Sequence, residues 1–294
     1  MIGRTLVQGS AVVVAAGSML AGASGVFAQE AAAPEVNSGN ISLDLGVDIT
    51  THYFFRGILQ EDQGLIFQPY GTVNVALWEG DDMVKTVGVY VGTWSSFHSG
   101  PTGTDVNGNA WYEADIYGGV TAELEGGFTA GLGYTYYDSP NDSFESIQEI
   151  SVSVGYDDTG LIMEDFALSP YALIAFEIDN AADGGDEGIY LEVGIAPAIE
   201  VLKSEDYPVT LSFPIAVGMS IDDYYEDGNG DDDFFGFASF GVKASVPLSF
   251  IPAEFGAWEA SAGVSLLVLG DNMEEVNNGD DLEVIGKVGI SMSY

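Results

Sequence analysis

The chain has 294 residues and is strongly acidic, with 46 Asp and Glu against 6 Lys and Arg and a formal net charge of −40 at pH 7. This charge repels nucleic acid, and the absence of cysteine excludes disulfides, thiolate metal sites and thiol nucleophiles. Disorder is the usual consequence of such acidity, but 47% hydrophobic and 12% aromatic residues contradict it, so acidic and apolar residues must be segregated in space.

Residues 1–28 have the pattern of a cleaved secretory signal peptide. Arg4 precedes an apolar run rich in Ala, Gly and Ser, and a Val-Phe-Ala triplet ending at Ala28 fits a signal peptidase site. We therefore expect export through the inner membrane, a lead over residues 29–40 and one folded domain over residues 41–294. No later stretch has the ~18 consecutive apolar residues that a membrane-spanning helix needs.

Apolar and polar residues alternate from Ile41 onward with the period of β-strands. In the fourth predicted strand, which begins at Ala110, we expect Tyr112 on the outer side. In the seventh, which begins near Tyr171, Leu173 and Ile174 leave open which residues face outward. Pro214 weakens the hydrogen-bond ladder of the ninth, which begins at Val209. Twelve strands are predicted over or within residues 41–50, 65–78, 87–94, 110–118, 128–136, 149–156, 171–178, 189–196, 209–217, 239–244, 258–266 and 282–294.

The last predicted strand, residues 282–294, shows the alternation most clearly. Val288 and Ile290 lie on an apolar side, and Lys287 lies on the polar side. The chain ends on Tyr294 and so resembles the closing strand of bacterial outer-membrane barrels, whose terminal aromatic is recognised by the assembly machinery. We expect the same partner here.

These patterns predict an all-β fold, a transmembrane antiparallel up-and-down β-barrel of about 12 strands in the bacterial outer membrane. An even strand number and segments of ~10 residues suit such barrels, and closure satisfies every backbone hydrogen bond in lipid. We expect the aliphatic side of each strand to contact outer-membrane lipid. The side bearing Asp, Glu, Ser and Gly is expected to face a lumen.

Four blocks in the first half of the chain resemble the TorF-type porin family of Gram-negative bacteria. Residues 53–60, Tyr-Phe-Phe-Arg-Gly-Ile-Leu-Gln, look like its Y-x-F-R-G-x-x-Q signature, and further blocks follow in order at residues 88–95, 113–119 and 133–137. The resemblance covers residues 42–156. It implies an outer-membrane barrel more than it implies a particular transported solute.

The inward side of the predicted strands carries many more carboxylates than basic groups. Rings of acidic side chains favour cations in a pore, so we expect a cation-preferring lumen. The alternative is a plugged lumen whose acids pair with lysines, tyrosines and water. Arg56 either faces Asp48 at a constriction or, in the favoured interpretation, pins the first loop by a structural ion pair. The candidate lumen residues are Asp44, Asp48, Arg56, Glu113, Asp115, Glu149, Glu192, Lys243, Glu259, Glu283 and Lys287.

A second candidate site is an acidic loop that begins like an EF-hand, with the pattern D-x-N-x-D. Its sixth position is Asp232 instead of Gly and its twelfth is Ala238 instead of Glu, which argues against a true EF-hand. Loose Ca²⁺ or Mg²⁺ binding and a merely solvated loop remain the two alternatives. The candidate ligands are Asp227, Asn229, Asp231 and Asp233.

For acid–base chemistry the chain offers only His52 and His98, and no arrangement of nucleophile, base and orienting group is legible around them. We therefore expect no enzyme. The favoured function is passive diffusion of small, preferentially cationic solutes through a porin-like channel. One alternative is a non-conducting structural or surface barrel whose acidic loops bind divalent cations, and another is an outer-membrane lipid-modifying enzyme. The oligomeric state stays open.

Overall fold

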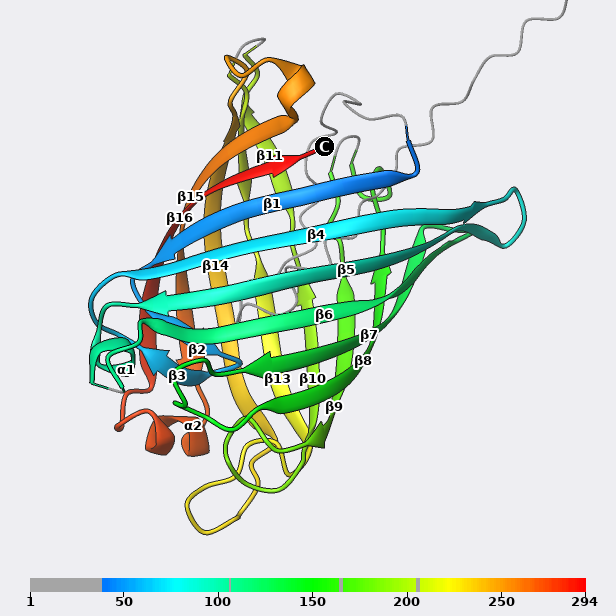
Figure 1. The fold of residues 1–294 in the computed structure, drawn as a ribbon. Coiled ribbons are helices and arrows are strands. Elements are labelled where there is room, and N and C mark those ends of the chain that lie inside the picture. The colour runs from blue at the N-terminus through cyan, green and yellow to red at the C-terminus, as the bar shows by residue number, and fades with distance from the viewer. Residues whose placement is uncertain (1–38, 106, 164–165, 205–206) are drawn as a thin grey trace, which may run out of the picture.

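The computed structural model describes residues 39–294 except 106, 164–165 and 205–206. The predicted signal peptide and nearly all of the predicted lead lie outside the described residues. Among the residues described, no helix combines the length and the apolar character needed to cross a lipid bilayer. Strands make up most of the described chain (Figure 1).

Fourteen strand segments join in one antiparallel sheet, in which β14 pairs with both β13 and β15 and so closes a ring. Neighbours in the ring are neighbours in the sequence, and β1 meets β16 at the seam, where Val47 is opposite Ile290. The segments are β1 (Ile41–Thr50), β4 (Ile66–Glu79), β5 (Val84–His98), β6 (Trp111–Leu124), β7 (Phe128–Asp138), β8 (Ile147–Tyr156), β9 (Tyr171–Asp179), β10 (Ile189–Ile195), β11 (Ala198–Leu202), β12 (Val209–Ser212), β13 (Ile215–Asp222), β14 (Phe235–Pro247), β15 (Ala257–Leu269) and β16 (Leu282–Ser293).

Two of the ring's strands are interrupted by proline, which explains why fourteen segments make twelve strands. Pro197 separates β10 from β11, and Pro214 separates β12 from β13. Proline has no N–H to donate to the ladder. The ladder resumes through the carbonyl groups, because Phe213 N donates to Pro197 O and Gly241 N donates to Pro214 O, at 2.8 and 2.7 Å. The closed twelve-stranded barrel predicted from the sequence is therefore confirmed.

The outer face of the barrel carries aliphatic rows and ends in aromatic side chains. On β16, Leu282, Val284, Val288 and Ile290 are all exposed, whereas the residues between them are partly buried. Exposed Phe67 packs 6.2 Å from Phe97, which stacks on Trp111 at 5.6 Å. Apolar belts bordered by aromatic rings suit a bilayer and its two interfaces.

One predicted orientation is wrong. Tyr112, expected outside, is buried at 5% exposure, and Trp111 takes the outer position. The cause is a shift of register between β5 and β6: Ser96 is opposite Glu113, but the next residue, Phe97, is opposite Trp111. Such a bulge moves the side chains beyond it to the other face.

The two ends of the barrel differ. The turn end holds the start of β1, the last residue Tyr294 and the connections β4–β5, β6–β7, β8–β9, β11–β12 and β14–β15. The last of these contains the short 3₁₀ helix η2 (Ala253–Phe255). The loop end, at the lower left of Figure 1, holds the longer connections with helices α1 (Pro101–Thr104) and α2 (Asp271–Val276).

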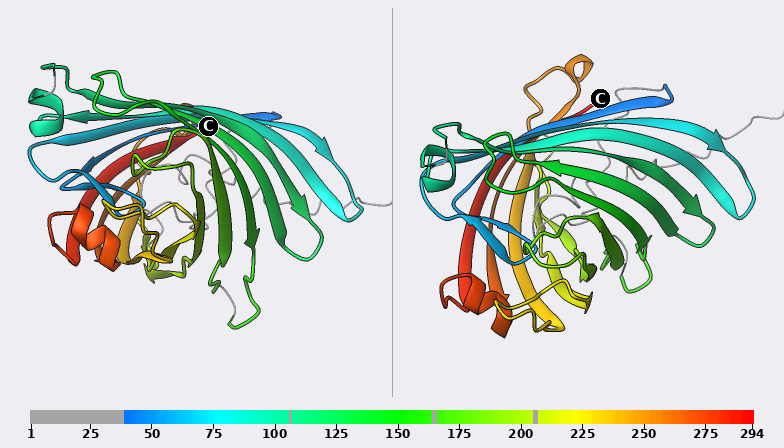
Figure 2. Two further views of the ribbon diagram at one scale, coloured as in Figure 1. Left: turned by 90° about the horizontal axis from the view of Figure 1, so that it is seen from below. Right: turned by 60° about the horizontal axis from the view of Figure 1, so that its bottom comes forward.

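The connection after β1 does not project into solvent but folds into the loop end as a hairpin of β2 (Tyr53–Phe55) and β3 (Ile58–Glu61) (Figures 1 and 2). We call residues 53–61 the inner hairpin. Its turn is Arg56-Gly57, with φ values of 49° and 90°. Positive φ at both central residues is the geometry of a type I′ turn, which glycine adopts freely and arginine only at a cost.

The inner hairpin completes the two apolar clusters that fill the loop end. Phe54 and Ile58 belong to one cluster, with Tyr190, Tyr225 and residues of β9, β14 and β15. Tyr53 and Phe55 belong to the other, which consists otherwise of Ile66, Trp94, Tyr112, Tyr117, Tyr137 and Ile147. The hairpin thus joins opposite walls of the barrel.

Candidate functional site: the inner hairpin and the acidic lumen

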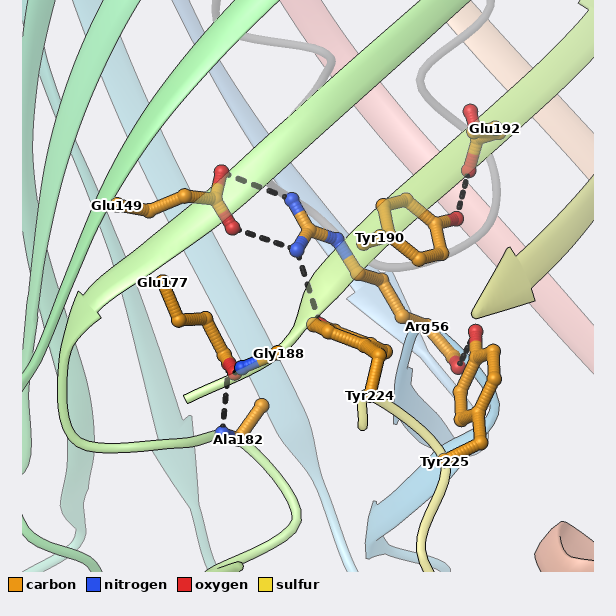
Figure 3. Close-up of polar contacts among 9 residues, drawn as sticks. All are labelled: Arg56, Glu149, Glu177, Ala182, Gly188, Tyr190, Glu192, Tyr224 and Tyr225. Carbon is orange, nitrogen blue, oxygen red and sulfur yellow. Dashed lines mark hydrogen bonds and ion pairs between the residues drawn. The ribbon is translucent and has the colours of Figure 1, made fainter. Parts of the chain in front are cut away.

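Arg56, at the tip of the inner hairpin, reaches the wall of the barrel and forms a two-pronged ion pair with Glu149 on β8. Its Nη1 and Nη2 donate to the two carboxylate oxygens at 2.6 and 3.0 Å (Figure 3). Nη1 also donates to the hydroxyl of Tyr224 at 2.9 Å, and the guanidinium lies 4.2 Å from the ring centre of Tyr190. Arg56 and Glu149 are almost fully buried.

The charge of Arg56 is fixed by this arrangement. Burial, the largest single effect, lowers the pKa of Arg56. The charge and hydrogen bond of Glu149, together with Tyr224 and Tyr137, outweigh burial in sum and raise the pKa well above its ordinary value. The tip is therefore a permanent cation paired with one acid. Arg56, at the turn of the first loop, is thus paired with Glu149, whereas Asp48, its expected neighbour at a constriction, lies 3.6 Å from Lys287.

The tip is also held through its backbone by two other loops. Tyr225, after β13, donates its hydroxyl to Arg56 O at 2.8 Å. Asn277, directly after α2, donates to Gly57 O at 2.6 Å and accepts from Leu59 N at 2.8 Å. The hairpin is thus fastened by side chains from connections far along the chain, none of which the sequence analysis identified.

The base of the hairpin is anchored by a chain of hydrogen bonds. Glu61 accepts from the N–H and hydroxyl of Thr102 in α1, at 3.0 and 2.7 Å. The Thr102 hydroxyl contacts His98 Nδ1 at 2.6 Å, and His98 Nε2 contacts Ser96 Oγ at 2.7 Å. Ser96 and His98 are two residues apart on β5 and so share a face, which is the one sequence signal that could have paired them.

The remaining acids of the predicted lumen lie nearer the turn end or along the wall. Asp44 accepts from Asn74 at 2.7 Å and from Ser293 at 2.8 Å. Lys287 lies 3.6 Å from Asp48, and Lys243 lies 3.9 Å from Glu259. The side chains of these two pairs are between 19% and 46% exposed, so water reaches them.

Four further predicted residues lie at three places on the inner wall. Glu192 accepts from the hydroxyls of Tyr171 and Tyr190. Glu283 is partly buried near the loop end. Glu113 accepts from the Tyr53 hydroxyl of the inner hairpin at 2.8 Å, and its neighbour Asp115 on β6 is fully buried. The predicted lumen residues therefore do not form one ring but are spread along the inner wall.

The acidic loop between β13 and β14 is organised by hydrogen bonds to Asp227. One carboxylate oxygen accepts from the N–H groups of Asn229 and Asp231 at 2.8 and 2.9 Å, and the other accepts from the Asn229 side chain. These bonds, that from Asp231 first, lower the pKa of Asp227. Asp233 accepts from Phe235 N at 3.5 Å. Within the described residues, no three His, Asp or Glu side chains gather as metal ligands would.

Solved structures with a similar fold are outer-membrane barrels. An outer-membrane channel from Pseudomonas putida F1 aligns with a TM-score of 0.50 at 10% identity, covering 88% of this chain and 97% of its own. The NanC porin aligns at 0.42 and 10% identity, covering 85% and 98%, and the β domain of the Bordetella autotransporter BrkA at 0.44 and 10%, covering 87% and 99%. At such identities the likeness concerns the fold alone.

No curated protein matches the sequence. A family model does, over residues 28–204, which is more than half of the chain and includes the inner hairpin with its Arg56 turn. This chain belongs to the family described as bacterial protein of unknown function (Gcw_chp).

Proposed function

We propose that this barrel is a porin-like channel of the bacterial outer membrane, through which small, preferentially cationic solutes diffuse passively. The observation that carries the proposal is the charge of the inner wall. Eight predicted lumen acids face three basic side chains, each of which is already paired with one acid: Arg56 with Glu149, Lys243 with Glu259 and Lys287 with Asp48. A wall with unbalanced carboxylates attracts cations and repels anions.

Three further observations support a channel. The fold resembles that of an outer-membrane channel. Residues 53–60 resemble the signature of the TorF-type porin family. The paired lysines are between 28% and 46% exposed at the side chain, which indicates water inside the barrel away from the hairpin. The inner hairpin is then the constriction, and selectivity comes from fixed charge without any chemical step.

The test is conductance of the purified, refolded protein in a planar lipid bilayer. Under a KCl gradient we expect a reversal potential of the sign that indicates cation preference. Glu259→Gln is expected to reduce that potential and Lys243→Gln to increase it, because the two substitutions change the wall charge in opposite directions. Anion preference in the wild type would refute the charge argument even if a pore exists.

A non-conducting structural barrel is the second candidate, and the observation that favours it is the closure of the loop end by the inner hairpin. Tyr53, Phe54, Phe55, Arg56 and Ile58 are each at most 8% exposed. This candidate predicts a silent bilayer for the wild type and also for a variant whose hairpin is unlocked, such as Arg56→Ala. Current through the unlocked variant would instead show that the hairpin closes a pore.

We propose no enzymatic activity, although Ser96 and His98 form the contact that a nucleophile and its base would make. Both side chains are 0% exposed, and His98 stacks on Tyr112 with ring centres 4.3 Å apart. Ester substrates therefore have no access to the hydroxyl. Phospholipid hydrolysis by the refolded protein that disappears in Ser96→Ala and in His98→Gln would contradict this and favour a lipid-modifying enzyme.

We further propose that the aliphatic outer rows contact outer-membrane lipid and that the barrel-assembly machinery recognises the last strand. Tyr294 is exposed, and its backbone is paired with Leu43 of β1 by two hydrogen bonds of 2.8 Å. Once the seam between β1 and β16 has closed, the Tyr294 ring can therefore be recognised only from the outer surface of the barrel. Slower assembly of Tyr294→Ala than of Tyr134→Ala in vivo would support this role.

A further inference from the structure

In the described part of the chain, three buried side-chain oxygens have no hydrogen-bond partner, and all three lie at one place. They are both carboxylate oxygens of Asp115 and the hydroxyl of Tyr137. Asp115 on β6 and Tyr137 on β7 are directly opposite each other in the sheet, and both side chains point inward, with exposures of 0% and 2%. Unpaired buried polar atoms are rare and destabilising, so three at one place indicate that a ligand belongs there.

The charge at this place is also unbalanced. Glu113 lies beside Asp115, is nearly as buried, and has the Tyr53 hydroxyl as its hydrogen-bond donor. The charged neighbours of Asp115 are Glu113 and Asp138, both acidic, and the carboxyl groups of Glu113 and Asp115 lie close enough to share a proton. Arg56, the basic side chain of the inner hairpin, is occupied by Glu149. A water molecule would satisfy the hydrogen bonds, but two ionised carboxylates at this place would still lack a counter-ion.

We propose that Asp115, Glu113 and Tyr137 form a binding site for one hard divalent cation, of the class of Ca²⁺ and Mg²⁺. Carboxylate and hydroxyl oxygens are the ligands such ions prefer, and a charge of +2 balances the two carboxylates. Once the two carboxyl groups are ionised, Asp115 supplies both of its oxygens, Glu113 supplies one besides that bound to Tyr53, and water completes the coordination shell. This site is separate from the acidic loop at Asp227.

The site lies under the inner hairpin. Phe55 covers Tyr137 with ring centres 5.3 Å apart in an edge-to-face contact, and Tyr53 is hydrogen-bonded to Glu113. A cation bound here removes the repulsion between the two acids that face the hairpin, and therefore stabilises the docked hairpin. A role of this site in ion passage rests on the proposed function, but cation binding to the site can be measured without any current.

The experiment uses the full refolded chain in detergent, freed of metal with a chelator and then dialysed against CaCl₂ or MgCl₂. We expect the wild type to bind the ion and its midpoint of thermal unfolding to rise with ion concentration. In Asp115→Asn both the bound ion and the rise are expected to be lost. Asp227→Asn, in the acidic loop, is the matched control, which removes one carboxylate and should retain both.

Equal binding by wild type and Asp115→Asn would overturn the proposal, as would loss of binding in Asp227→Asn alone. A proton shared by the two acids is the rival occupant. It predicts that the midpoint of thermal unfolding of the wild type falls as pH rises and does not change when Ca²⁺ is added. That result also overturns the proposal. If Asp115→Asn does not fold, Tyr137→Phe and Glu113→Gln test the same ligands. If the protein binds the cation specifically but carries no current in planar bilayers, the cation site stands and only the channel function is refuted.

Discussion

Arg56 and Glu149 are 93 residues apart in the chain, yet their side chains form a two-pronged ion pair inside the barrel, at 2.6 and 3.0 Å. The pair joins the turn of the inner hairpin to the wall strand β8. It explains why an arginine occupies a turn position with φ of 49°, where glycine or asparagine would be less strained. The cost in backbone conformation is offset by a contact that only this side chain can make.

Removing one member of the pair should be strongly destabilising. Arg56→Ala leaves the Glu149 carboxylate buried without a counter-ion, and we expect a loss of about 3–5 kcal/mol in the free energy of unfolding. The double variant Arg56→Met with Glu149→Leu is expected to lose less than Arg56→Ala, because no uncompensated charge remains. Urea unfolding in detergent measures both. Arg56→Met and Glu149→Leu are also measured alone, and a double variant whose loss equals the sum of those two losses would show that the residues are not coupled.

Unlocking the hairpin should also change ion flow. Asn277→Ala removes two hydrogen bonds to the hairpin backbone without adding or removing charge. We expect a larger or more often open conductance in planar bilayers, with unchanged cation preference. Asn229→Ala, in the exposed loop between β13 and β14, is the neutral control. Identical single-channel records for Asn277→Ala and the wild type would mean that the hairpin does not limit the current.

The strands could be predicted because period-2 alternation is a local property of the sequence. A bulge is not, since it depends on how two strands align, and so Tyr112 was assigned to the wrong face while Ile116, beyond the bulge, was assigned correctly. The interruption at Pro214 could be predicted because proline cannot donate a hydrogen bond to the ladder. Pro197 interrupts the preceding strand in the same way.

The inner hairpin has a recognisable pattern in its sequence. A connection in which Tyr-Phe-Phe and Ile-Leu flank Arg-Gly is too apolar for a loop in water, and Arg-Gly with β-type residues on both sides fits a two-residue hairpin turn. The partners of Arg56 could not be predicted in the same way. Glu149, Tyr224 and Asn277 meet the hairpin only after the ring has closed.

The two faces of β16 allow a direct test of the membrane assignment. Val288 is exposed on the outer face, whereas Ser291 faces the interior. Val288→Arg is expected to cost about 2–4 kcal/mol when the barrel folds into bilayers, because it places a charge at lipid depth. Ser291→Arg, which places the same charge in the lumen opposite Glu259, should cost little. Folding into lipid vesicles measures both, and equal losses would contradict the assigned faces.

High pH should release the hairpin through its tyrosines. Burial, before any other cause, raises the pKa of Tyr224 and of Tyr225 well above the ordinary value, because the phenolate would have to form away from water. In the unfolded chain both titrate near pH ~10. A group whose pKa is higher in the folded state contributes stability that is complete below its unfolded pKa and is lost as pH rises toward the folded value.

We therefore expect the free energy of unfolding in urea to be steady between about pH 7 and pH 9 and to fall above pH ~10. Tyr225→Phe should make that fall shallower while removing the bond to Arg56 O at every pH, whereas Tyr207→Phe, at the exposed turn end, should leave the profile unchanged. A profile that stays flat well above pH ~10 would show that ionisation of these tyrosines does not oppose docking of the hairpin.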